Sequence, residues 1–273
     1  GTDVVVGFGG YVAMPAYLAA RGRVPIVIHE ANAKAGLANR VGARFTPYVA
    51  QAVDGSLPQA ETVGIPLRQV IVELDRAQQR SEARQFFGLS HERPCLLVFG
   101  GSQGARRIND AVDGAVEQLV GAGIQVLHVV GDQNLDQGAD LTTRFPASYR
   151  RLGYVDRMDL AYAAADLALC RSGAMTCAEL SAVGLPAVYV PLPIGNGEQR
   201  LNAAGIVSAD GGAFLPDDQL SPDSVADLVL PLLSDPQRLG RMAQAAAGQG
   251  VRDAGVRLAD LIEQAAVVGK GGK

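Results

Sequence analysis

The sequence is poor in the residues that build disulfide frameworks and metal sites. It has no tryptophan, three cysteines and three histidines among 273 residues. Cys95, Cys170 and Cys177 lie in or beside apolar segments without Cys-x-x-Cys spacing, so we expect reduced thiols in the core. The histidines are scattered and no Asp-x-Asp pair occurs, so the sequence predicts no metal ion and no other cofactor.

Long apolar runs and a strong net charge are also missing. No run approaches the roughly 20 apolar residues of a membrane span, and the N-terminus lacks the pattern of a signal peptide. The net charge of −4 argues against general binding of nucleic acid. Residues 1–50 nevertheless carry five basic and two acidic side chains, which favours contact between this end and an anionic membrane surface. Solvated helix faces are an alternative explanation for that charge.

What the sequence has is an alternation of strand-like and helix-like segments, with 33 glycines and 48% apolar residues. This alternation is typical of parallel βαβ units. The expected strands are near residues 4–6, 25–29, 48–52, 95–99, 125–130, 151–155, 166–169, 187–190 and 213–215. The expected helices are near 12–20, 36–43, 82–87 and 105–120, after Ser221-Pro222, after Asp235-Pro236, and over 256–262.

The glycine and proline of Val63–Pro66 indicate a domain exit. We therefore expect part of one Rossmann-like domain over residues 1–66 and a complete one over 67–250. Residues 251–273 are expected to form a closing helix and tail. A doubly wound domain usually needs more than about 100 residues, so the first domain is expected to be incomplete.

One glycine-rich segment follows a strand and opens a helix. In Gly100–Ala105, the glycines permit tight turning, and the backbone N–H groups and the Ser102 hydroxyl can donate to phosphate oxygens. An ordinary strand-to-helix turn is the alternative. A nicotinamide site fits less well, because the spacing is not Gly-x-Gly-x-x-Gly.

A second such corner ends the apolar run Asp166–Cys170. Arg171-Ser172-Gly173 precedes a helical segment with Glu179 on its second turn. A diphosphate held at this helix start would lie near Arg171, and a ribose could reach the Glu179 carboxylate. An exposed glutamate and a surface ion pair are the alternatives. Further along, the amides of Gln199 and Asn202 suit sugar hydroxyls.

The first portion contains two comparable strand ends. Gly7–Tyr11 joins a strand to a helix, and His29–Asn32 ends the next strand. A lone His-Glu pair is usually structural, so its spacing does not indicate catalysis.

Together these segments resemble the MurG family of N-acetylglucosaminyltransferases of peptidoglycan synthesis. The resemblance covers essentially the whole chain. It rests on five ordered motifs: Gly7–Val12, His29–Asn32 with Ala35–Leu37, Gly100–Ala105, Cys170–Glu179 and Gly184–Pro186.

The resemblance implies an α/β protein of the GT-B type, with two Rossmann-like domains and the donor held mostly by the second one. It implies the inverting transfer of N-acetylglucosamine from UDP-N-acetylglucosamine to the 4-hydroxyl of undecaprenyl-pyrophosphoryl-N-acetylmuramoyl-pentapeptide. The implied location is peripheral, at the cytoplasmic face of the bacterial inner membrane. The implied contacts are the Val155 backbone with uracil, Glu179 with ribose, Ser102, Arg171, Ala174, Met175 and Thr176 with the diphosphate, Gln199 with the sugar, and Asn32 and Arg68 closing the site.

The sequence departs from the family pattern at two places. Family members often have two glutamines where this chain has Glu198-Gln199, and they open with a glycine-rich loop ending in a histidine, which nothing before Gly1 supplies. Within this chain, Glu30 is the candidate for the catalytic base. Two alternatives remain: a UDP-sugar-binding module without catalysis, and a UDP-N-acetylglucosamine epimerase, which the motifs fit poorly.

Overall fold

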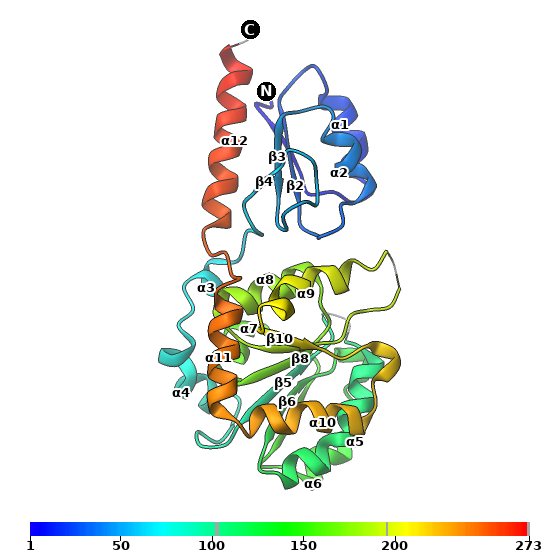
Figure 1. The fold of residues 1–273 in the computed structure, drawn as a ribbon, viewed down its shortest axis with the longest axis vertical. Helices are drawn as coiled ribbons and strands as arrows, with labels where there is room; N and C mark the ends of the chain where they lie inside the picture. Colours follow the sequence, from blue (N-terminus) through cyan, green and yellow to red (C-terminus); the bar gives the residue numbers. More distant parts are fainter. Residues whose placement is uncertain (102–103, 195, 272–273) are drawn as a thin grey trace. The chain divides into compact units, whose positions relative to one another are not determined.

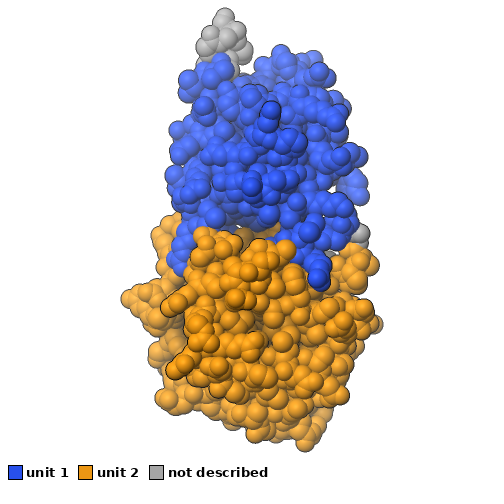
Figure 2. All heavy atoms as spheres, in the orientation of Figure 1, with its two compact units in different colours: residues 1–68, 195–202, 251–273 blue, residues 69–194, 203–250 orange. Residues whose placement is uncertain are grey.

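A computed structural model describes residues 1–101, 104–194 and 196–271 of the chain. It divides into two compact units (Figure 2). Unit 1 comprises residues 1–68, 195–202 and 251–273, and unit 2 comprises residues 69–194 and 203–250. Among the described residues, no helix has both the length and the apolar character needed to cross a bilayer.

Unit 2 is built on a six-stranded sheet in which every neighbouring pair of strands is parallel (Figure 1). The strand order is β10-β9-β8-β5-β6-β7, so the chain starts at β5, moves outward to β7, and then crosses to the other side of β5. The strands are β5 (Cys95–Phe99), β6 (Gln125–Val129), β7 (Tyr149–Leu152), β8 (Leu167–Cys170), β9 (Ala187–Tyr189) and β10 (Gly212–Phe214).

Helices cover both faces of this sheet (Figure 1). The α-helices of unit 2 are α3 (Gln69–Val72), α4 (Arg76–Phe86), α5 (Arg106–Gly121), α6 (Ala139–Arg144), α7 (Met158–Ala164), α8 (Ala174–Val183), α10 (Pro222–Leu233) and α11 (Pro236–Ala247). Helix α9 (Glu198–Ser208) starts in unit 1 and ends in unit 2, and two 3₁₀ turns occupy Asp132–Asn134 and Asp217–Gln219.

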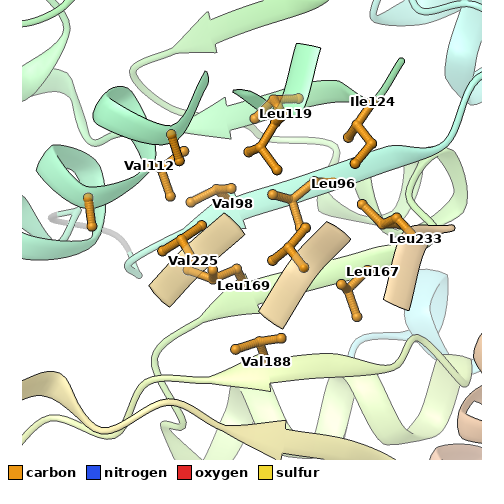
Figure 3. Close-up of a cluster of buried hydrophobic side chains, with 14 of the residues drawn as sticks. Leu96, Val98, Val112, Leu119, Ile124, Leu167, Leu169, Val188, Val225 and Leu233 are labelled. Carbon is orange, nitrogen blue, oxygen red and sulfur yellow. The ribbon is translucent and has the colours of Figure 1, made fainter. Parts of the chain in front are cut away.

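The main core of unit 2 lies between the sheet and helices α5 and α10. Successive residues of a strand point to opposite faces, so Leu96 and Val98 of β5 point to this core together with residues of the neighbouring strands (Figure 3). Val112 of α5 and Val225 of α10 are fully buried against them. Each such side chain contributes about 1.5–3 kcal/mol through burial.

Local signals fix where these helices begin. The Ser221 side chain accepts a hydrogen bond from the Ser224 N–H, Ser224 returns one to the Ser221 N–H, and Pro222 occupies the first helical position. The Asp235 and Asp75 side chains cap α11 and α4 by accepting from the N–H groups of Arg238 and Gln78. The Ser-Pro and Asp-Pro signals therefore predicted the start of α10 and of α11 correctly.

Unit 1 contains a four-stranded parallel sheet in the order β1-β2-β3-β4. Tyr17 and other residues of the first helix pack on one face, and Leu258 and Leu261 of the last helix pack on the other. The elements are β1 (Val5–Gly7), α1 (Ala13–Ala20), β2 (Ile26–Glu30), α2 (Leu37–Gly42), β3 (Tyr48–Gln51), β4 (Glu61–Thr62) and α12 (Ala254–Gly271).

The observed elements differ from the sequence expectations in several places. The strand expected at 151–155 is β7 at 149–152, the helix expected at 82–87 begins at Arg76, and the helix expected at 256–262 spans 254–271. Elements that were not predicted are α3, α6, α7, α9 and β4. Most of these are only two to seven residues long, too short for a hydrophobic period to be visible.

A buried arginine holds the amino-terminal edge of the unit 2 sheet together. Arg84 is 0% exposed, and its guanidinium donates to the carbonyl oxygens of residues 90, 91, 93 and 164. It also donates to Asp166 Oδ2 at 2.9 Å, and the same oxygen accepts from the Cys95 N–H at 2.8 Å. Helix α4 is thereby joined to the starts of β5 and β8.

We expect Arg84→Met to lower the free energy of unfolding by about 3–5 kcal/mol, because it leaves these buried acceptors without a donor. The matched control is Arg80→Met, which removes the half-exposed partner of Asp166 Oδ1 and should cost about 1 kcal/mol or less. Urea denaturation measures both. Equal costs for the two variants would contradict the role of Arg84.

Candidate functional site

The carboxyl ends of the unit 2 strands form the edge on which the candidate residues meet. The chain passes from β5 to β6 on one side of β5, whereas β8 lies on the other side of β5. Ligands of open parallel sheets bind at such a switch point, outside the carboxyl ends of the strands. The loop after β5 and the loop after β8 therefore flank the expected binding position.

The loop after β5 can turn only because it is built from glycine. A Cβ on Gly100 would lie 2.3 Å from the Ala105 nitrogen. A Cβ on Gly104, whose φ is +73°, would lie 1.9 Å from the Val130 carbonyl oxygen. Helix α5 begins directly afterwards, and no described side chain caps it. Its first N–H groups can therefore serve an anion. Ser102, the predicted hydroxyl donor, lies outside the described residues.

The loop after β8 opens helix α8 in the same manner. Gly173 is the N-cap residue, so among the described residues no side chain occupies the capping position. Ala174, Met175 and Thr176, predicted at the diphosphate, form the first turn of this ten-residue helix. Met175 is exposed and the other two are partly exposed. Backbone N–H groups at this turn present the positive end of the helix dipole to the edge.

Glu179 lies on the second turn of α8 and is 8% exposed. Its Oε2 accepts a hydrogen bond from the Tyr162 hydroxyl at 2.7 Å. A carboxylate so placed accepts from hydroxyl groups, since each of its oxygens has two lone pairs. The sequence predicted Glu179 but not its partner Tyr162, because α7 was not recognised.

Arg171 has a carboxylate partner that the sequence did not suggest. Its guanidinium donates to Asp217 Oδ1 at 2.6 Å and to the Val190 carbonyl oxygen at 3.1 Å. Arg107 binds the other oxygen, Asp217 Oδ2, at 2.9 Å. Arg171 Nε is buried and has no hydrogen-bond partner among the described residues. Two arginines thus share one buried aspartate next to the start of α8, which leaves a local excess of positive charge.

The remaining predicted residue of unit 2, Val155, is itself buried in the segment between β7 and α7, at the same edge, and its neighbours Tyr154 and Asp156 are exposed.

Cys170 is the last residue of β8, and Cys177 lies in α8. Burial raises the pKa of Cys177 to about 12 and that of Cys170 well above its usual value. Both thiols are therefore protonated at neutral pH and act as small core residues.

In unit 1, Glu30 ends β2 and is almost fully buried. Its Oε1 accepts from the Asn32 N–H at 2.9 Å and from Asn32 Nδ2 at 3.3 Å. Its Oε2 accepts from the Gly36 N–H and from Asn39 Nδ2, both at 3.0 Å. The carboxylate thus holds the segment 32–39 in place, and these four bonds do not favour a role for Glu30 as catalytic base.

Asn39 extends this network to the loop after β1. Its Oδ1 accepts from the Tyr17 hydroxyl at 2.8 Å, and its Nδ2 also donates to the His29 carbonyl oxygen at 3.1 Å. Gly9, with a φ of +84°, passes so close that a Cβ would lie 3.0 Å from Asn39 Nδ2. The loop after β1 and the segment after β2 are therefore joined through Asn39.

His29 itself is buried, and its Nε2 lies 2.7 Å from the Gly64 carbonyl oxygen. Burial lowers the pKa of His29, so the ring is neutral at pH 7 and Nε2 carries the proton. The bond to Gly64 supports the structural reading of the His-Glu pair.

The other predicted residues of unit 1 are Gln199, Arg68 and Asn32. Gln199 is on the first turn of α9, three residues before Asn202, whose Oδ1 accepts from the Ala33 N–H at 2.9 Å. Arg68 is exposed at the end of the first segment of unit 1. Asn32 is partly buried beside Glu30. Among the described residues, no three His, Cys, Asp or Glu side chains are grouped as metal ligands would be.

We expect Glu30→Gln to destabilise unit 1 by about 2–3 kcal/mol, since an amide cannot accept all four hydrogen bonds. Amide exchange at Asn32 and Gly36 should accelerate. The control is Glu61→Gln on the exposed strand β4, which should change little. Hydrogen exchange and thermal unfolding test this. If unfolding and exchange matched those of the unchanged chain while catalysis was abolished, Glu30 would be the base instead.

The comparisons with known proteins agree with this geometry. Residues 95–258 match the glycosyltransferase family 28 C-terminal domain, and residues 2–51 match the glycosyltransferase family 28 N-terminal domain. The chain is 60% identical to the "UDP-N-acetylglucosamine--N-acetylmuramyl-(pentapeptide) pyrophosphoryl-undecaprenol N-acetylglucosamine transferase" of Acidothermus cellulolyticus, over 97% of this chain and 73% of that protein.

Two solved structures are also similar. The crystal structure of MurG from Acinetobacter baumannii has a TM-score of 0.81 and 31% identity, over 96% of this chain and 74% of that one. A UDP-GlcNAc 2-epimerase from Neisseria meningitidis has a TM-score of 0.69 over 96% of this chain and 76% of that one. At 13% identity, that second likeness shows only a shared fold.

These matches confirm the expected α/β fold of the GT-B type and the resemblance on which it was based. The chain belongs to glycosyltransferase family 28 and, within it, to the MurG family of N-acetylglucosaminyltransferases.

Proposed function

We propose that the chain transfers N-acetylglucosamine from UDP-N-acetylglucosamine to the 4-hydroxyl of undecaprenyl-pyrophosphoryl-N-acetylmuramoyl-pentapeptide, with inversion at the anomeric carbon. One observation carries the proposal. Two helix starts that no described side chain caps, those of α5 and α8, and the buried carboxylate of Glu179 meet at the switch point between β5 and β8. Such an edge suits a nucleoside diphosphate, because it offers N–H donors to phosphate and an acceptor to ribose.

Each part of the donor has a chemically matched group in the chain. The diphosphate takes the N–H groups of the loop after Phe99 and of Ala174–Thr176, together with Ser102 and Arg171. The ribose hydroxyls donate to Glu179. The uracil ring lies against the backbone of Val155, and Gln199 hydrogen-bonds the hydroxyls of the sugar. No cofactor takes part in this scheme.

Transfer requires the acceptor hydroxyl to attack the anomeric carbon while the bond to the β-phosphate oxygen breaks. Negative charge then develops on the leaving UDP, and preorganised N–H groups with Arg171 stabilise it. Asp217 holds Arg171 in position, and Arg107 offsets the charge of that aspartate. A general base must accept the hydroxyl proton. We assign Glu30 to loop positioning in place of that task, on the strength of its four hydrogen bonds.

The acceptor carries a lipid, and unit 1 has a surface that suits a bilayer. Tyr11 and Leu37 are 101% and 73% exposed, and they line a hollow of ≈ 350 Å³ together with Met14 and Ala38. Phe8 and Val12 are also exposed. The basic side chains of residues 1–50 add attraction to anionic lipids. This surface supports peripheral binding to a membrane that holds the acceptor, and we assign that binding to the cytoplasmic face.

The transfer itself is tested with purified chain, UDP-N-acetylglucosamine and a lipid-linked muramoyl-pentapeptide. We expect a disaccharide product, and we expect Glu179→Gln to weaken UDP binding by roughly ten-fold or more, because ribose loses a charged acceptor. Glu117→Gln on the exposed face of α5 is the matched control and should bind normally.

Other outcomes decide between the alternatives. Binding of the donor without transfer would support a catalytically incomplete binding module. Formation of the manno epimer from the donor alone would support the epimerase. An absence of any binding to UDP would overturn the proposal.

We expect Tyr11→Ser and Leu37→Ser each to reduce binding to vesicles with about 30% anionic lipid by roughly ten-fold, the value of one buried apolar side chain. Val256→Ser, which removes an exposed apolar residue of α12, is the control and should not change binding. Vesicle co-sedimentation at several salt concentrations measures this. Equal behaviour of all three variants would argue against this surface.

A further inference from the structure

We propose that Tyr162 is a positioning residue for recognition of the ribose: its hydroxyl holds the Glu179 carboxylate in the orientation that accepts the ribose hydroxyls. This inference rests on the proposed donor site. It gives α7, which lies outside all the motifs named from the sequence, a role in the selection of the nucleotide.

The geometry of the pair is well defined. The Tyr162 hydroxyl donates to Glu179 Oε2 at 2.7 Å, and the two residues are 1% and 8% exposed. A hydrogen bond to a carboxylate of this length is in the strong range. Oε2 keeps a second lone pair, so the bond to Tyr162 does not prevent it from also accepting a hydroxyl of a ligand.

The tyrosine is itself fixed from several directions. Its ring packs near Phe99, the last residue of β5, with ring centroids 6.2 Å apart. Its carbonyl oxygen accepts from Arg76 Nε at 2.9 Å, and the same guanidinium donates to the carbonyl oxygens of Ala165 and Gly184. Arg76 thereby joins the end of α7 to the end of α8. The donor and the acceptor of the Tyr162–Glu179 bond sit on helices that cannot shift independently.

The physical benefit of this arrangement is preorganisation. The terminal torsion of a glutamate is broad, so an unrestrained carboxylate samples many orientations. Binding a ribose would then carry the entropic cost of ordering it. A hydrogen bond from a rigid, buried phenol removes that cost before the ligand arrives. Loss of the bond should therefore weaken the contacts with ribose hydroxyls and leave the contacts with diphosphate and uracil intact.

The chain offers a matched control. Tyr189 on β9 is also fully buried, but its hydroxyl has no hydrogen-bond partner among the described residues. Burial raises the pKa of Tyr189 well above its usual value, so the phenol stays neutral. Tyr162→Phe and Tyr189→Phe thus remove the same atom from two buried tyrosines, and only the first loses a bond to Glu179.

The experiment is calorimetric titration of the full chain with UDP and with 2′-deoxy-UDP. For Tyr162→Phe we expect UDP affinity to fall roughly ten-fold and 2′-deoxy-UDP affinity to fall much less, so that discrimination between the two nucleotides shrinks. For Tyr189→Phe both affinities should match those of the unchanged chain. Equal losses for both nucleotides in Tyr162→Phe would indicate a merely structural role and overturn the inference.

A double-mutant cycle keeps the test decisive if Tyr162→Phe is less stable. In the Glu179→Ala background, which has no acceptor for the Tyr162 hydroxyl, adding Tyr162→Phe should cause no further loss of UDP affinity. Additive losses would overturn the inference. If the unchanged chain binds UDP and discriminates against 2′-deoxy-UDP but Tyr162→Phe retains that discrimination, only this inference fails. If the unchanged chain does not bind UDP, the proposed function fails with it.

Discussion

The loop between β5 and α5 depends on one close backbone contact, in which Gly104 lies against the Val130 carbonyl oxygen. No side chain fits there, because a Cβ would lie 1.9 Å from that oxygen. The same oxygen accepts from Asn109 Nδ2 at 3.0 Å and from Asn134 Nδ2 at 2.9 Å. One carbonyl group therefore positions the glycine loop, the first turn of α5 and the segment after β6.

This carbonyl is in turn connected to the interior of unit 2. Asn109 Oδ1 lies 3.2 Å from His128 Nε2, and His128 Nδ1 lies 2.9 Å from the Tyr149 hydroxyl. Burial lowers the pKa of His128, so a neutral ring links the two. Asp113, paired with Arg151, completes the network. The loop that we propose to bind the diphosphate is thus supported by a network of buried polar groups.

The sequence predicted the parts of the fold that local chemistry determines. The apolar run of β5 and the proline signals of α10 and α11 are local, and the structure follows them.

The sequence could not predict Asp217 as the partner of Arg171, because only the fold brings these two residues together. Strand β7 spans Tyr149–Leu152, whereas the sequence predicted it over 151–155, because short strands have few residues from which to read their ends. Tyr162 was missed since the short, apolar α7 shows no helical period. Glu30 was named for its carboxylate, but the four N–H groups that donate to it are brought there by the fold of the loop, which the sequence does not show.

Unit 1 is built from segments that lie far apart in the sequence, which affects the order in which the chain can fold. Leu258, Leu261 and Ala265 of α12 complete the core against Val27 and Val63, so one face of the first sheet stays open until the last helix exists. Unit 2, by contrast, is finished by residue 250. During synthesis from the N-terminus, unit 2 can fold before α12 has been made, whereas the core of unit 1 needs α12. The strands of unit 1 are therefore translated before unit 2 but complete their packing after it.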